Sequence, residues 1–137
     1  MDRKHLGGTA LTKIKESMQA MVQAINKSPN AKKAIKKWIS TYDGKIISFH
    51  LGEEKFHIIF SEEETRIEDG EYPSPDATLV TSPQAFQNLI KTPLNIKNML
   101  KSGEIEVWGN LHEFLALLQQ VILSDLDILN TIQEALK

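Results

Sequence analysis

The sequence has 137 residues, of which 41% are hydrophobic and 25% charged, with a formal net charge of -2 at pH 7. This length and composition predict a single domain over residues 1–137 with a hydrophobic core. The net charge argues against nucleic acid as the main partner. The lack of cysteine excludes disulfides and thiol catalysis. No apolar run approaches the roughly 20 residues of a membrane-spanning helix, and no signal core follows the N-terminus, so we expect a cytoplasmic protein.

The N-terminal third predicts two helices. Residues 1–8 are polar and end in two glycines, which indicates a flexible lead-in. Thr9 is expected to cap a helix that Ser28-Pro29 ends, and Asn30 to cap the next one. The first helix has apolar residues at helical spacing. These are Leu11, Ile14, Met18, Met21, Val22 and Ile25.

The second helix places its lysines opposite an apolar stripe that includes Ile35 and Trp38. Its lysines are Lys32, Lys33, Lys36 and Lys37. A solvated face is the ordinary interpretation of such a pattern. The alternative is transient contact with anionic membrane headgroups, worth about 1 kcal/mol per lysine near the surface.

The middle of the chain predicts an antiparallel meander. Apolar residues alternate through residues 46–51 and 56–60, with a turn at Gly52-Glu53-Glu54 between them. A third strand is expected around Thr65 and Ile67. The two prolines after Asp69-Gly70 mark a loop, because proline cannot donate to a sheet ladder.

The stretch from Asp76 to Asn110 predicts strand, helix, helix, strand. Ser82-Pro83 and Thr92-Pro93 are helix-start signals, and Gly103 is a helix C-cap. Strands joined by such a helical excursion can be neighbours in one sheet, with the helices on one face. We therefore predict an α+β fold, with a five-stranded, mainly antiparallel sheet covered on one face by about five helices.

The C-terminal region predicts two more helices. Asn110 caps the first, with Glu113 in a capping-box position, and Ser124 caps the second. The first is apolar over too much of its circumference for one stripe, so it is covered on more than one side. We expect the helix from Ser124 to act as a lid, and truncation at Leu123 to lower ligand retention or cause aggregation.

No catalytic constellation is evident. His50 and His57 are expected to face each other across the hairpin, but no third ligand accompanies them, so we predict no metal site and no cofactor. The carboxylates cluster at turns, and the chain has neither a nucleophile-elbow pattern nor a glycine-rich phosphate loop. These absences predict a protein that is not an enzyme.

The hydrophobic residues leave two interpretations open. A short sheet under helices with wide apolar arcs can form a filled core, or it can enclose a cavity for an elongated apolar ligand. Met18, Met21 and Met99 would supply adaptable side chains to either arrangement. The composition alone does not choose between them.

The pattern resembles the sterol carrier protein-2 (SCP-2) family. The resemblance rests on Asp76-Ala77-Thr78-Leu79, the helix with Phe86 and Leu89, and the residues Gly103, Ile105, Val107 and Gly109-Asn110. It extends over about Gly44–Ile122 and includes the meander and its Asp69-Gly70 turn. Two places depart from the family pattern. Lys91-Thr92-Pro93 stands where glycine is frequent, and Glu104 and Glu106 stand where lysines are frequent.

The resemblance implies a hydrophobic tunnel between sheet and helices. Family members bind sterols, fatty acids, acyl-CoAs and phospholipids without metal or redox cofactor. We therefore predict non-enzymatic binding or transfer of a lipid of sterol, fatty acid, acyl-CoA or isoprenoid type. The expected tunnel lining is Phe86, Leu89, Ile90, Met99, Leu100, Phe114, Leu118, Val121 and Ile122.

The alternative function is a self-associating accessory module with a filled core, for example one that supports quinone-lipid biosynthesis. Strand parity places Trp108 on the sheet face away from the helices. Beside Ile46 and Ile59 it would form an apolar patch suited to a homodimer.

Overall fold

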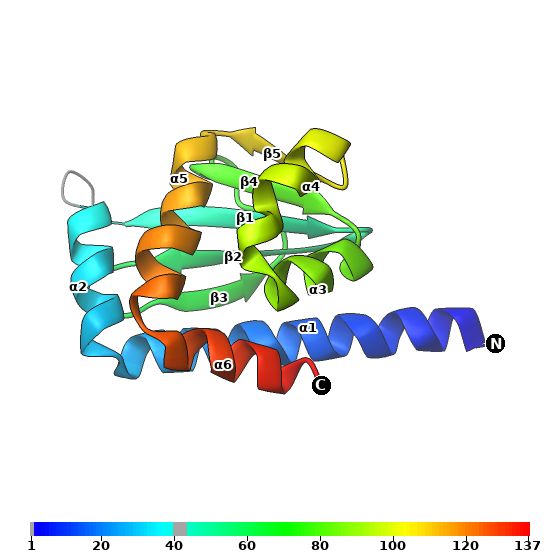
Figure 1. Ribbon diagram of the computed structural model, residues 1–137, viewed down its shortest axis with the longest axis horizontal. Coiled ribbons are helices and arrows are strands. Elements are labelled where there is room, and N and C mark those ends of the chain that lie inside the picture. Colours follow the sequence, from blue (N-terminus) through cyan, green and yellow to red (C-terminus); the bar gives the residue numbers. More distant parts are fainter. Residues whose placement is uncertain (1, 40–43) are drawn as a thin grey trace.

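The computed structural model describes the backbone of residues 2–39 and 44–137 and the side chains of residues 11–39 and 44–137. These residues form five strands and six α-helices, with short 3-10 and π segments between them (Figure 1). The strands are β1 (Lys45–Leu51), β2 (Glu54–Phe60), β3 (Arg66–Asp69), β4 (Ala77–Thr81) and β5 (Ile105–Gly109). The helices are α1 (Asp2–Lys27), α2 (Pro29–Trp38), α3 (Pro83–Lys91), α4 (Ile96–Ser102), α5 (Leu111–Ala116) and α6 (Leu126–Ala135).

The sheet has the strand order β3-β2-β1-β4-β5. The meander β1-β2-β3 is antiparallel, as predicted. β4 and β5 are sheet neighbours, as the strand-helix-helix-strand pattern predicted, and they pair antiparallel. Among the strand pairs formed by the described residues, only β1 and β4 are parallel, so the sheet is mixed and mainly antiparallel. The predicted α+β class and the five strands are confirmed.

The helices lie on one face of the sheet (Figure 1). In this view α3, α4 and α5 cross in front of the strands, while α1 and α6 run side by side along the lower edge and are in contact. The chain from β3 to β4 must pass β2 and β1. The Tyr72 ring on this connection lies 5.3 Å from the His57 ring. The connection therefore covers part of the sheet face that has no helices.

Asp76 ties the two halves of the sheet together. Its backbone N–H donates to Ile46 O over 2.8 Å, and its Oδ2 accepts from Ile46 N–H over 2.8 Å. Its carbonyl accepts from the backbone N–H of Asn110, the N-cap of α5. Gly109 passes so close that a Cβ on it would lie 3.0 Å from Asp76 O. The sheet therefore fixes where α5 begins.

Several helix boundaries differ from the sequence prediction. α1 begins at Asp2 rather than Thr9, because the two glycines lower helix propensity by only about 1 kcal/mol each and no proline interrupts the pattern. Ser28, not Asn30, caps α2, with Pro29 as the first helical residue. Asp125, not Ser124, caps α6. In both cases a nearer side chain reaches the free backbone N–H groups.

The helix predicted from Asn110 does not stay α-helical. After Ala116 it continues as a π-helical segment at Leu117–Val121 and a 3-10 turn at Ile122–Ser124. π segments within helices are uncommon and are frequent at functional sites. The segment here lies over the centre of the core, where Leu117, Leu118 and Val121 are buried.

Candidate functional site

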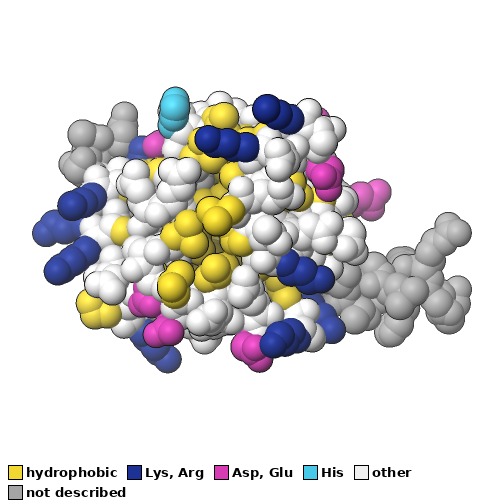
Figure 2. Space-filling view, in the orientation of Figure 1, with side chains coloured by type: hydrophobic (Ala, Val, Ile, Leu, Met, Phe, Trp, Pro, Cys, Tyr) yellow, Lys and Arg dark blue, Asp and Glu magenta, His cyan; other side chains and the backbone are white. Residues whose placement is uncertain are grey.

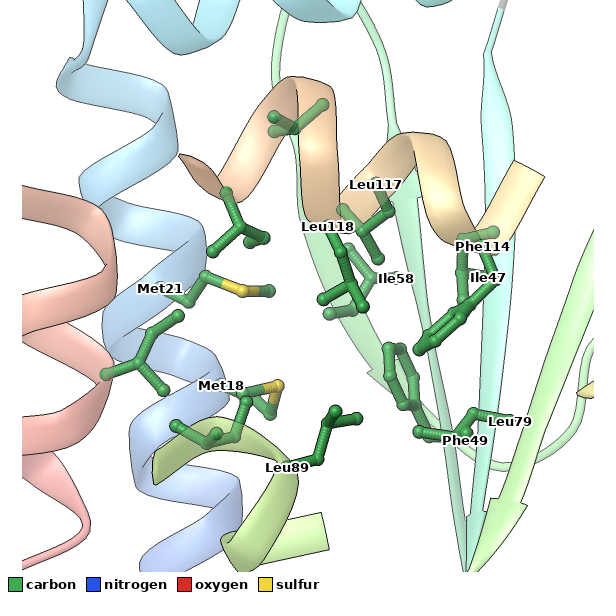
Figure 3. Close-up of a cluster of buried hydrophobic side chains, with 14 of the residues drawn as sticks. Met18, Met21, Ile47, Phe49, Ile58, Leu79, Leu89, Phe114, Leu117 and Leu118 are labelled. Atoms are coloured by element: carbon green, nitrogen blue, oxygen red, sulfur yellow. The ribbon is translucent and has the colours of Figure 1, made fainter. Parts of the chain in front are cut away.

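A small apolar cavity lies between the sheet and the helices, at the cluster of side chains drawn in Figure 3. Its walls come from α1, β1, α3, the π segment and α6. All of its lining residues are apolar. They are Met18, Met21, Phe49, Phe86, Leu89, Ile90, Pro93, Phe114, Leu117, Leu118, Ile122, Leu129 and Ile132.

The free volume of this cavity is about 30 Å³. A single water needs roughly 10–15 Å³ measured in this way, whereas sites for drug-sized ligands span about 300–1,000 Å³. The cavity as it stands therefore has room for about two waters and not for a lipid chain. At this position the structure therefore has a small apolar cavity and not the open tunnel that the resemblance implies.

The nine predicted lining residues divide into two groups. Six of them line the cavity: Phe86, Leu89, Ile90, Phe114, Leu118 and Ile122. Met99 and Val121 are fully buried in the core away from it, and Leu100 packs partly buried against the core. Local helical spacing found the inward faces of α3 and of the segment after Asn110, but it could not separate core from cavity wall.

The lining residues that were not predicted come mostly from distant segments. Met18 and Met21 on α1 and Leu129 and Ile132 on α6 close one side of the cavity. These side chains meet because α1 and α6 pack against each other. The only available signal was the pair of methionines on an apolar stripe. On the sheet side, Phe49 stacks on Phe56 with ring centroids 5.0 Å apart.

A second hollow lies outside the cavity, between α4 and the π segment. It is a groove of about 290 Å³, and we call it the α4 groove. It shares Pro93 and Leu118 with the cavity, so these two side chains border both spaces. Figure 2 shows hydrophobic side chains gathered in the middle of this face of the molecule. The groove is lined by Pro93, Leu94, Ile96, Lys97, Leu115, Leu118, Gln119 and Leu123.

The family model described as the SCP-2 sterol transfer family matches residues 18–121. This match covers most of the chain. The chain belongs to the SCP-2 sterol transfer family. Membership supports lipid binding or transfer in general terms and confirms the resemblance seen in the sequence. No curated protein matches the chain.

Solved structures with the SCP-2 fold agree with this assignment. A "UbiJ-SCP2 Ubiquinone synthesis protein" is similar with a TM-score of 0.65 and 16% identity, covering 84% of this chain and 96% of that one. The apo sterol carrier protein 2 of Yarrowia lipolytica gives a TM-score of 0.53 at 17% identity, covering 84% and 88%. A sec-alkylsulfatase, Pisa1, from a Pseudomonas species gives 0.55 at 11%, covering 66% of this chain but 14% of the enzyme. At these identities the likeness concerns the fold.

A buried ion pair anchors the start of α5 in this SCP-2 family member. The Lys45 ammonium contacts the Glu113 carboxylate, and both side chains are largely buried. The Trp38 indole N–H also donates to Glu113, over 3.3 Å. Glu113 therefore joins α5 to β1 and α2 instead of closing the predicted capping box. The cap at Asn110 is confirmed, since its side chain accepts from His112 N–H.

The two hairpin histidines have separate partners. The His57 ring contacts Gly70 O through Nδ1 at 2.9 Å and Glu68 through Nε2 at 3.2 Å. His50 lies 3.6 Å from Glu71, and its ring is nearly perpendicular to the Trp108 ring, with ring centroids 5.7 Å apart. Within the described part of the chain, no group of three or more His, Asp or Glu residues is placed to hold a metal ion.

Trp108 is 53% exposed on the sheet face without helices. Its register partner on β4 is Thr78, which in turn pairs with Ser48. Ile46 and Ile59 pair with each other two residues further along. The indole therefore lies against His50 and not in the row of Ile46 and Ile59.

No single helix among the described residues is long and apolar enough to cross a membrane. The segments Leu111–Ser124 and Leu126–Ala135 satisfy length and composition together, but they are bent by 100°.

Proposed function

We propose that this protein is a non-enzymatic lipid carrier that takes the apolar chain of a sterol, fatty acid, acyl-CoA or isoprenoid-type ligand into the cavity under α6. The observation that supports it is a wholly apolar cavity at the π segment of an SCP-2 family member. Each methylene that leaves water contributes about 0.8 kcal/mol. Burial of a chain of several methylenes therefore favours binding and opposes the cost of displacing the side chains that now fill the core.

Because the cavity is nearly closed, binding in this proposal requires α6 to move. Few polar bonds hold that helix. Ser28 Oγ donates to Asp125 over 2.8 Å, and Gln133 Nε2 donates to the carbonyl of Ile90 over 3.1 Å. Lys13 Nζ on α1 also donates to the carbonyl of Lys137, just after α6, over 3.2 Å, and among the described residues Ile128 and Ile132 of α6 are buried in the core, where α6 contacts α1 and α3. Apolar contacts are non-directional, so an acyl chain can replace them as α6 shifts.

Mass spectrometry of organic extracts from the purified protein tests the proposal first. A stoichiometric lipid is the expected result, and an empty protein that also fails to bind added fatty acid would contradict it. Leu118→Trp then blocks the boundary between groove and cavity and is expected to weaken fatty acid binding about tenfold or more. Leu126→Trp is the matched control, because Leu126 is 65% exposed and lines no part of the cavity.

A second candidate is a self-associating accessory module, for example in quinone-lipid synthesis. The small cavity volume and the exposed Trp108 favour it, and the ubiquinone synthesis protein is a structural neighbour. Trp108→Glu is expected to convert a homodimer to monomers in sedimentation equilibrium. A wild-type protein that stays monomeric at millimolar concentration would rule this candidate out.

We also propose that the lysines of α2 contact membranes transiently. The four lysines of α2 are exposed and make no ion pair with a described residue. Figure 2 shows Lys or Arg side chains gathered on the side where α2 lies. The α2 lysines form the proposed transient contact with anionic membranes. We also predict that the protein is cytoplasmic.

A further inference from the structure

We propose that the α4 groove is the head-group subsite of the carrier, and that Lys97 binds the anionic head of a single-chain amphiphile there. The proposal rests on the proposed lipid function and adds where the ligand enters and which head group it carries. Its ligand class is a long-chain carboxylate.

The groove has the size and the position that such a subsite requires. Its volume of about 290 Å³ is roughly ten times that of the cavity behind it, which is about 30 Å³. Pro93 and Leu118 border both spaces. Leu118 belongs to the π segment, whose hydrogen bonding is already irregular, so its side chain lies where the wall is easiest to deform. A chain that enters at Leu118 leaves its head in the groove.

The groove also has the chemistry of an amphiphile site. Leu94 on its border is 85% exposed, a large apolar side chain that a bound chain would cover. Lys97 and Gln119 are the polar members of its lining, and no described residue that lines it is acidic. A lysine ammonium and an amide N–H both donate hydrogen bonds, and the ammonium is a strong partner for a carboxylate.

Lys97 is available for this role. It is exposed and makes no hydrogen bond or ion pair with any residue of 11–39 or 44–137. Its stem can lie along the exposed Leu94 side chain, three residues earlier, while the ammonium stays at the border of the groove, as lysines on apolar surfaces do. The acidic residues Glu104 and Glu106 lie on and before β5, outside the groove lining. They therefore supply no carboxylate to the groove lining.

Lys101 offers a matched control. It lies one turn further along α4, is also exposed, and does not line the groove. Lys97→Glu and Lys101→Glu change the net charge equally on the same helix. We titrate each variant calorimetrically with dodecanoate and with dodecanol, at a pH of about 7.5 where the carboxylate is ionised. Because the two ligands have the same alkyl chain, the difference in their affinities reports the contribution of the head group. Both variants are checked for unchanged unfolding midpoints.

The expected result is specific to one variant and one ligand. Lys97→Glu weakens dodecanoate binding about tenfold or more, equivalent to about 1.4 kcal/mol, and leaves dodecanol binding within about twofold. Lys101→Glu changes both affinities by less than about threefold. Equal losses in the two variants, or equal losses for acid and alcohol, would overturn the head-group role.

The same titrations distinguish a wrong assignment of the head-group subsite from a wrong assignment of the lipid-carrier function. If the wild-type protein binds both ligands and Lys97→Glu changes neither affinity, the carrier function survives and the subsite is wrong. If the wild-type protein binds neither ligand, both are wrong. If a second copy of the chain occupied the groove, it would compete with dodecanoate. The apparent dodecanoate affinity would then fall as the protein concentration rises, and this result would also overturn the head-group subsite.

Discussion

Gly109 shows how a single residue positions the helix that borders the cavity. Its φ of +83° lies in the left-handed region, and a Cβ there would meet Asp76 O at 3.0 Å. Asp76 in turn holds β1 and the start of α5. Only glycine satisfies the conformation and the close approach together.

Gly109→Ala is therefore expected to destabilise the protein more than Gly103→Ala does. Gly103 has a nearly identical φ of +82°, but a Cβ on it meets nothing within 4 Å. The Gly103 variant measures the conformational cost alone, about 1 kcal/mol. The Gly109 variant adds the clash, at least about 1 kcal/mol more. Urea unfolding measures both, and equal losses would show that the approach to Asp76 is unimportant.

Lys45 and Glu113 form a buried ion pair, and we expect the removal of one partner to destabilise the protein. Glu113→Ala removes the carboxylate that contacts the buried ammonium and accepts from Trp38, so we expect a loss of about 3 kcal/mol. The double variant Lys45→Met, Glu113→Met removes both charges and is expected to lie within about 1 kcal/mol of the wild type. Additive losses in urea unfolding would mean that the two side chains act independently.

Among the secondary-structure elements, α1 is held along one edge of the molecule by polar contacts with the sheet. Asn26 near its end bonds both backbone groups of Thr65, over 2.8 and 2.9 Å. Lys15, nearer its start, pairs with Glu54 at 2.5 Å and with Asp69 at 3.2 Å. These contacts fix α1 against the hairpin and β3, so in the proposed binding step we expect α1 to stay in place while α6 shifts.

The Lys15 contacts predict a pH dependence. The hydrogen bond to Glu54 raises the pKa of Lys15 above its usual 10.5, although partial burial opposes the shift. A raised folded-state pKa means that the stabilisation is complete below about pH 10.5 and is lost as the pH rises through the folded-state value. The contribution is under about 1 kcal/mol, because the pair is partly exposed.

Lys15→Met tests this dependence. The free-energy difference between wild type and variant, from urea unfolding, is expected to be constant between about pH 8 and 10 and to vanish toward pH 12. Taking the difference cancels the titration of the other lysines. A difference that persists unchanged to about pH 12 would show that the lysine stem, and not its charge, contributes the stability.

Local signals in the sequence predicted the elements well where one side chain or glycine decides the boundary. Ser82, Gly103 and Asn110 are the caps that their residue types indicated. The prediction was wrong at Asn30 and Ser124, where a neighbouring residue competes for the same N–H groups. The π segment was missed because the apolar spacing of residues 111–122 also fits a regular helix.

At the scale of the whole molecule, the cavity wall combines segments far apart in the chain. The inward faces of α3 and α5 were predictable from their own periodicity, whereas Met18, Leu129 and Ile132 join them through the packing of α1 on α6. The volume of the cavity was not predictable, because it is a small difference between the space the backbone encloses and the volume that side chains fill. Both interpretations of the apolar residues therefore remained open in the sequence.

In the proposed function, an apolar chain enters the small cavity between α1, α6 and the sheet. Methionine methyl NMR with 13C-labelled methionine tests it most directly, because Met18 and Met21 line the cavity while Met99 is buried elsewhere in the core. On titration with dodecanoate, we predict shifted Met18 and Met21 resonances with cross-peaks to the acyl chain, and an unshifted Met99. Methyl spectra without such cross-peaks at saturating dodecanoate would contradict the account.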